Sequence, residues 1–90
     1  MDRIIQAGDI VKSLSGHDKN QLFLVLSIDK FGFLDIINGR SRKIEKPKKK
    51  NPKHVQFVAT DKNLLNRLNS PTITNAELYK LINLYKNNEE

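Results

Sequence analysis

The sequence contains no cysteine, and this absence excludes several kinds of site. Without a thiol the chain can form no disulfide, no thiolate metal site and no cysteine nucleophile. The lack of disulfides fits a reducing compartment. Apolar runs are short as well, because none approaches the roughly 18 residues that would span a membrane. Residues 1–6 lack the long apolar core of a signal peptide, so we expect a soluble, cytoplasmic protein that does not associate with membranes.

The residues that usually carry catalysis are also scarce. His17 and His54 are the only histidines, whereas a zinc site needs about four ligands at suitable spacing. Ser13, Ser15, His17 and Asp18 are crowded on one short stretch, which is not the geometry of a catalytic triad. The acidic residues are scattered, and no glycine-rich phosphate loop is present. We therefore predict a protein that is not an enzyme and that binds neither metal nor cofactor.

Positive charge is present and is concentrated in one segment. The 90 residues carry a net charge of +6 with a pI of about 9.7, and a pI above about 9 is typical of nucleic-acid-binding domains. Residues 40–53 hold eight basic residues and one acidic residue, and the rest of the chain is close to neutral. This distribution indicates a polyanion bound at one place. The basic residues of the segment are Arg40, Arg42, Lys43, Lys46, Lys48, Lys49, Lys50 and Lys53.

The first two-thirds of the chain have the pattern of short strands, and the length suits a single domain. The nearly continuous apolar run at residues 22–28 predicts a strand that is buried on both faces or crosses a barrel core. Asn38-Gly39 favours a type I′ hairpin turn. Residues 46–53 contain two prolines and a run of like charges, so we predict an exposed basic loop there. The expected strands are residues 9–14, 22–28, 33–37, 41–45 and 54–59.

The last third of the chain changes to a helical period. A short helix is predicted around residues 64–68, capped by Thr60 or Asp61. Thr74 and Glu77 have the spacing of a capping box, with Ile73 and Leu78 placed as its hydrophobic staple. We predict a β-barrel in residues 1–60, including the basic loop 46–53, and a helical extension in residues 61–90 that packs on it. The packing face of the last helix would be Leu78, Leu81, Ile82 and Tyr85.

Residues 8–25 resemble a KOW motif. They open with Gly-Asp-Ile-Val, place Gly16 eight residues after Gly8, and run through a turn-rich loop into an apolar strand. Residues 42–55 and 74–78 also resemble small bacterial KOW proteins, which are similar to archaeal and eukaryotic large-subunit ribosomal proteins with an N-terminal KOW domain. Asn20 stands where the motif has its most characteristic glycine. Because asparagine tolerates a left-handed backbone conformation, we expect the turn to survive.

The resemblance implies a fold and a function. The fold is mainly β, a small SH3-like (KOW) five-stranded barrel with one or two short C-terminal α-helices. The function is RNA binding by a ribosomal-protein-like module that is monomeric when free. Its expected partner is rRNA of the large ribosomal subunit, and ribosomal proteins are further candidate partners. The expected contacts are the first loop and the basic segment, namely Lys12, Gly16, His17, Lys19, Asn20, Arg40, Arg42, Lys43, Lys46, Lys48, Lys49, Lys50, Lys53 and His54.

Other interpretations of the same residues stay open. The lysine run could be a solvated loop that only aids solubility, and residues 15–20 an ordinary hairpin turn. The chain could be a protein-interaction module of the transcription or translation machinery with RNA binding secondary, or it could bind anionic lipid through its lysines. For the phenylalanines, packing in the core is favoured over a platform for stacking bases, and only Phe31 is left open. These residues are Phe23, Phe31, Phe33 and Phe57. Tyr79 and Tyr85 are expected to pack the helix.

Overall fold

The computed structural model describes residues 4–70 and 73–88, which form a five-stranded antiparallel sheet with one short helix before its last strand and the other helices after it. The strands are β1 (Asp9–Ser13), β2 (Leu22–Ile28), β3 (Leu34–Ile37), β4 (Lys48–Lys50) and β5 (Val55–Thr60), and their order in the sheet is β4-β3-β2-β1-β5. The helices are η1 (Pro52–His54), α1 (Lys62–Arg67), α2 (Asn75–Asn83) and η2 (Leu84–Asn88), of which η1 and η2 are 3-10 helices. The prediction of a mainly β fold with short C-terminal helices is thus confirmed.

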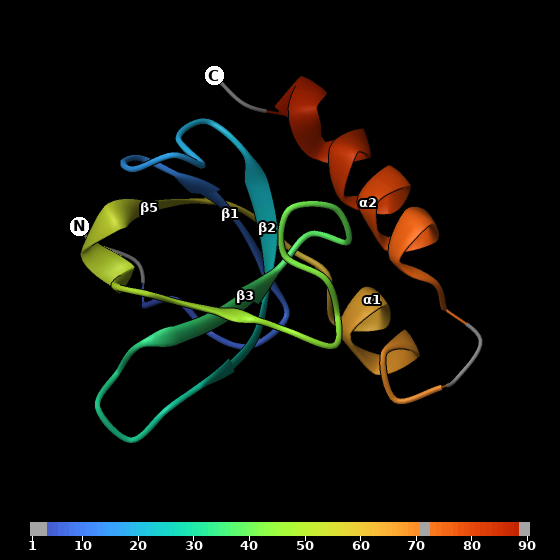
Figure 1. Cartoon of the computed structure of the whole chain (residues 1–90), viewed down its shortest axis with the longest axis horizontal. Helices are drawn as coiled ribbons and strands as arrows, with labels where there is room; N and C mark the ends of the chain where they lie inside the picture. The colour runs from blue at the N-terminus through green and yellow to red at the C-terminus, as the bar shows by residue number, and fades with distance from the viewer. Residues whose placement is uncertain (1–3, 71–72, 89–90) are drawn as a thin grey trace.

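Strand β2 has the two buried faces that its apolar run predicts. Leu22 and Leu24 join a core cluster with α1 and α2, whereas Phe23 and Val25 join a second cluster on the other face of the sheet. The second cluster draws its buried members from β1, β2, β3 and β5. Figure 1 shows α1 and α2 together on one side of the sheet, while the β2–β3 hairpin projects away from them.

The two α-helices begin where their capping residues predict. The Asp61 side chain accepts a hydrogen bond from the Leu64 backbone N–H at 2.9 Å, and Thr74 accepts one from Glu77 N–H at 3.1 Å. Only this half of the predicted capping box forms, because the Glu77 carboxylate pairs with Arg67 at 2.7 Å. The stripe of Leu78, Leu81, Ile82 and Tyr85 packs into the helix-side core as expected. Across the described residues, each helix falls short of the length and apolar character needed to span a bilayer.

The prediction of an exposed loop at residues 46–53 is wrong. Three of these residues form β4, which pairs with β3 so that Lys49 lies opposite Asp35, and two more begin η1. Pro47 and Pro52 lie outside the strand and do not interrupt it. Because β4 is at the edge of the sheet, only one side of its backbone has to pair. The lysines of β4 meet carboxylates on both faces, so their like charge does not prevent strand formation.

The predictions of a type I′ turn at Asn38-Gly39 and of a returning strand at residues 41–45 are also wrong. Gly39 has a φ of 80°, but Asn38 has no positive φ. The Asn38 side chain is buried, and its Oδ1 accepts hydrogen bonds from the backbone N–H groups of Arg40 and Arg42 at 2.9 and 3.0 Å. This competition for backbone donors is typical of asparagine and makes a wider turn. Residues 41–45 consequently form turns and bends in place of a strand.

The aromatic residues only partly follow the expectation of core packing. Phe23 is fully buried and Phe57 is half-buried. Phe33 is 40% exposed and Phe31 is 76% exposed. Both lie in the β2–β3 turn, where Asp29 Oδ1 accepts hydrogen bonds from their backbone N–H groups. The turn therefore holds these two rings outside the core, and the expectation is wrong for Phe33.

Candidate nucleic-acid interface

The loop between β1 and β2 keeps the turn expected of it. Asn20 adopts a φ of 73° and Gly16 a φ of 86°, and Asn20 N–H donates to the Ser13 carbonyl at 2.8 Å. Asparagine thus supplies the left-handed conformation in place of glycine. Gly16, His17, Lys19 and Asn20 are all exposed on this loop, so they are accessible to a partner.

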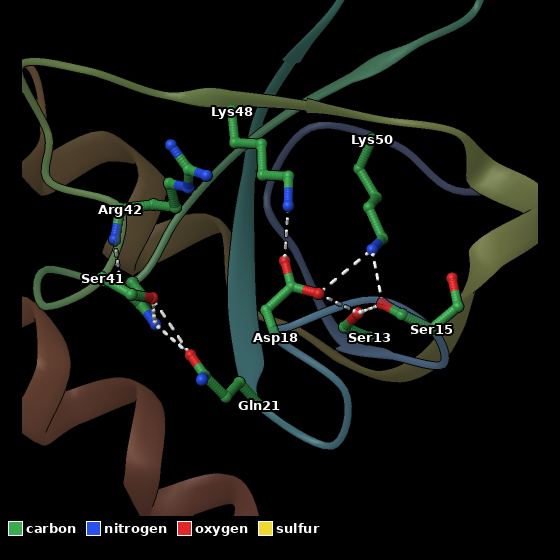
Figure 2. A network of polar contacts seen from close by, with 9 residues as sticks. Ser13, Ser15, Asp18, Gln21, Ser41, Arg42, Lys48 and Lys50 are labelled. Carbon is green, nitrogen blue, oxygen red and sulfur yellow. Dashed lines mark hydrogen bonds and ion pairs between the residues drawn. The ribbon is translucent and has the colours of Figure 1, made fainter.

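Asp18, in the same loop, is the centre of a buried polar network (Figure 2). Its Oδ1 accepts a hydrogen bond from Ser13 Oγ at 2.7 Å and lies 3.1 Å from Lys50 Nζ. Its Oδ2 lies 3.1 Å from Lys48 Nζ, and Lys50 Nζ also donates to the Ser15 carbonyl at 2.9 Å. Two lysines of the edge strand β4 are therefore bound to the β1–β2 loop.

This network fixes the charge of Asp18. Burial raises the pKa of its carboxyl, but the hydrogen bond from Ser13 and the contacts with Lys48 and Lys50 outweigh it and bring the pKa down to about 2. The carboxylate is therefore ionised throughout the physiological range. Lys50 is only 7% exposed, so an RNA phosphate could reach it only by disrupting the network.

Lys49 points to the opposite face of β4 and is also paired. Its Nζ lies 2.8 Å from Asp35 and 3.1 Å from Asp29. The hydrogen bonds to Asp35 and Asp29 raise the pKa of this lysine. All three consecutive lysines of β4 thus hold the fold together, and none of them is a free cation.

The remaining cations of the basic segment are not matched by acids. Arg40, Arg42, Lys43, Lys46 and Lys53 form no ion pair with any residue in the described part of the chain. Arg40, Lys43, Lys46, Lys53 and His54 are exposed, and Arg42 and Lys12 are half-buried. The described acidic side chains are all engaged in hydrogen bonds or ion pairs; they are Asp9, Asp18, Asp29, Asp35, Glu45, Asp61 and Glu77.

The fold brings two of the predicted contact segments together and leaves a third at one side. Gln21, at the end of the β1–β2 loop, accepts a hydrogen bond from Ser41 Oγ at 3.0 Å, so the loop adjoins the turn that follows Asn38. Lys53 and His54 lie in η1, which meets the end of β1 through the hydrogen bond from Leu14 N–H to the His54 carbonyl at 2.9 Å. Loop residues and residues 40–46 therefore form one candidate surface, with η1 beside it.

Sequence reasoning missed Asp18 as the counter-ion of the lysine strand, and it missed Tyr79. The Arg40 guanidinium donates to the Tyr79 hydroxyl at 3.0 Å and lies 5.1 Å from the centre of its ring. The hydrogen bond from Arg40 lowers the pKa of Tyr79. A signal for Tyr79 was present, because it shares an i, i+4, i+7 face with Asn83 and Lys86 next to the apolar stripe. For Asp18 no local pattern identifies the partner, which is 30 residues away.

No model of a known protein family matches the chain, and no curated protein sequence matches it.

Proposed function

We propose that the chain is an RNA-binding module of the KOW type that docks on rRNA of the large ribosomal subunit. The observation that carries this proposal is the set of cations left unpaired after every described carboxylate is engaged. Lys19, Arg40, Lys43 and Lys46 are exposed members of this set. They lie on two segments that the Gln21–Ser41 hydrogen bond holds together.

Several features of the sheet support an SH3-like, partly open barrel. The chain passes from β4 at one edge of the sheet to β5 at the other edge through residues 51–54 alone. The two edges are therefore brought close at that end. The Asp18 network adds side-chain bonds between β4 and the β1–β2 loop, and the left-handed Asn20 fits the loop geometry that the KOW resemblance implies.

Binding would work by docking onto a pre-formed surface. Arginine guanidinium groups can hold a phosphate with two parallel hydrogen bonds, whereas lysine acts as a point charge. Each phosphate that is neutralised releases condensed counterions, which favours binding at low salt. Asn38 fixes the backbone that carries Arg40 and Arg42, so less ordering is needed on binding than in a flexible basic arm.

A protein-interaction module is the second candidate, and one observation favours it. Ile28, Phe31 and Phe33 are 40%, 76% and 40% exposed and all lie at the β2–β3 hairpin. Exposed apolar groups that gather at one place are typical of protein contact sites. This hairpin is separate from the proposed RNA surface, so the two candidates can be tested independently.

The test is sedimentation of the protein with large ribosomal subunits through sucrose gradients at low and high salt. We expect co-migration at low salt that weakens at high salt. Lys43→Glu/Lys46→Glu should abolish co-migration, because both side chains are exposed and unpaired. Lys80→Glu, a single charge reversal at an exposed residue of α2, is the control to compare with Lys43→Glu alone and should leave co-migration unchanged. Lys48 and Lys50 are unsuitable for this test because their loss would disturb the fold.

Absence of the wild-type protein from the subunit fractions at low salt would overturn the proposal. Equal release by the Lys80→Glu control would show a nonspecific effect of charge and would also count against it. Loss of binding in Phe31→Ser, with the lysine variants unaffected, would favour the protein-interaction candidate.

A further inference from the structure

A groove lies between the sheet and the C-terminal helices. Its volume is about 310 Å³, which is at the small end of the roughly 300–1,000 Å³ typical of ligand pockets. It is bordered by the end of the β1–β2 loop, the turn after Asn38, and one face of α2 and η2. The side chains that matter for its chemistry are Asn20, Gln21, Arg40, Tyr79, Asn83 and Lys86.

The groove is positively charged and contains an aromatic ring. Arg40 and Lys86 line it, and none of its described lining residues is acidic. Lys86 is exposed and forms no ion pair within the described residues. The Arg40 guanidinium stacks near Tyr79 at 5.1 Å from the ring centre. An aromatic ring with a guanidinium near its hydroxyl offers an unpaired base a face to stack on and donors at its edge.

The hydrogen bonds around Asn38 determine which way the Gln21 amide points. Asn38 Oδ1 accepts from two backbone N–H groups, so its Nδ2 must donate, and it donates to Gln21 Oε1 at 3.3 Å. Ser41 Oγ donates to the same oxygen at 3.0 Å. The oxygen of Gln21 is thus occupied, and Figure 2 shows it turned toward Ser41 with the amide nitrogen turned away. The Gln21 Nε2 group has no partner among the described residues and is free to donate.

The walls of the groove are held in place by the fold. A Cβ atom at Gly39 would lie 2.1 Å from the Asn75 carbonyl oxygen of α2, so the turn that carries Arg40 and Ser41 packs directly on the helix. Asn75 also accepts a hydrogen bond from Ile44 N–H at 2.8 Å. The spacing between the turn and the helix is therefore fixed before any ligand binds.

We propose that this groove binds one unpaired nucleotide of the RNA and prefers guanine. The base stacks on the Tyr79 ring, with Arg40 at the edge of the base, and its phosphate lies toward Lys86. Gln21 Nε2 and the remaining Arg40 N–H groups are donors, so they match the adjacent O6 and N7 acceptors of guanine. Adenine presents an N6 amino donor beside N7 and fits this donor pair less well. This inference rests on the proposed RNA-binding function and adds base recognition to it.

The test compares two short single-stranded RNAs by fluorescence anisotropy, a polyadenosine and the same RNA with one central guanosine. We expect the wild-type protein to bind the guanosine RNA roughly fivefold or more tightly. Gln21→Glu keeps the oxygen that accepts from Asn38 and Ser41 but removes the donor, so the preference should disappear while the fold is retained. Asn66→Asp, an exposed residue of α1 outside the groove, adds the same charge and should keep the preference.

The outcomes separate the two proposals. Tight binding of both RNAs with equal affinity overturns the groove proposal and leaves RNA binding intact. A preference that survives in Gln21→Glu also overturns it. Failure of the wild-type protein to bind either RNA at low salt overturns the proposed function together with the groove. Tyr79→Ala is an independent check, because loss of stacking should weaken the binding of the guanosine RNA by roughly tenfold.

Discussion

At the scale of single residues, Asp18 has a predictable effect on stability. It is 6% exposed and balances Lys48 and Lys50. Asp18→Asn keeps the side-chain shape but leaves Lys50 buried without a counter-ion. Removal of one partner from a buried ion pair typically costs about 3–5 kcal/mol of stability. Because Lys48 is partly exposed and can be solvated, we expect a smaller loss of about 2–3 kcal/mol in the free energy of unfolding. Urea unfolding of both proteins at neutral pH measures the difference in free energy of unfolding.

The same pair of proteins gives a pH dependence with a definite sign. The folded pKa of Asp18 is about 2, below its ordinary value of 3.8. A depressed carboxyl pKa stabilises the fold above the unfolded value, and this contribution is lost as pH falls from about 4 through 2. The difference in free energy of unfolding between wild type and Asp18→Asn should therefore be constant above pH 5 and shrink below pH 4. A difference that persists unchanged to pH 2 would contradict the network.

Gly39 is the second residue with a predictable effect. Its φ is 80°, and an added Cβ would lie 2.1 Å from a backbone oxygen of α2. Gly39→Ala should therefore add both backbone strain and a clash, with a loss of roughly 2–4 kcal/mol in the free energy of unfolding. Gly32→Ala is the matched control, because Gly32 has a φ of 90° but nothing within 4 Å of its Cβ position. Gly32→Ala should be destabilised by backbone strain alone, by about 1 kcal/mol. Thermal unfolding of both variants measures the contrast.

At the scale of elements, what could be predicted depends on how local the determining contacts are. The apolar run at residues 22–28 and the caps at Asp61 and Thr74 are local signals, and they gave β2, α1 and α2 correctly. Strand β4 and the turn after Asn38 depend on distant partners. Asp18 is 32 residues from Lys50, and Asn38 is 17 from Gln21. A pattern of like charges and prolines contains no information about such partners, so a loop was predicted where a strand forms.

The same reasoning applies to the candidate site. The concentration of charge in residues 40–53 was visible in the sequence, but its division into paired and unpaired cations was not. Alternation along β4 sends Lys48 and Lys50 to one face and Lys49 to the other. Only the register of β4 with β3 determines that each lysine meets a carboxylate. The unpaired cations therefore lie before and after the lysine run and not in it.

The hydrogen bonds of Asn75 connect α2 to the basic segment. Asn75 Oδ1 accepts from Ile44 N–H at 2.8 Å, and its Nδ2 donates to both Glu45 oxygens at 2.9 and 3.0 Å. Asn75→Ala should release residues 43–46, because these bonds connect them to the helix. Amide hydrogen exchange at Ile44 should speed up by roughly tenfold, about 1.4 kcal/mol in local stability. The Leu14 amide, bonded to His54 far from the helix, is the internal control.

At the scale of the whole molecule, the fold turns a mixed charge distribution into a separated one. The described carboxylates are all engaged within the chain, in helix caps, turns and the β4 ion pairs. The sequence carries a net charge of +6, and most of the described cations without an ion pair are exposed. Those that adjoin the β1–β2 loop are Lys19, Arg40, Lys43 and Lys46. A surface of this kind attracts a polyanion and orients it before contact.

For the proposed RNA binding, the separation of charge predicts how affinity responds to salt. The logarithm of the association constant for single-stranded RNA falls with the logarithm of salt concentration, with a slope of roughly −0.7 for each phosphate neutralised. Neutralising Lys43 and Lys46 together, as Lys43→Gln/Lys46→Gln, should make the slope shallower by about 1.4. Lys49→Gln should leave the slope unchanged, because Lys49 is already paired with Asp29 and Asp35. An equal change of slope in both variants would mean that RNA displaces the carboxylates of β4, and the distinction between structural and binding lysines would fail.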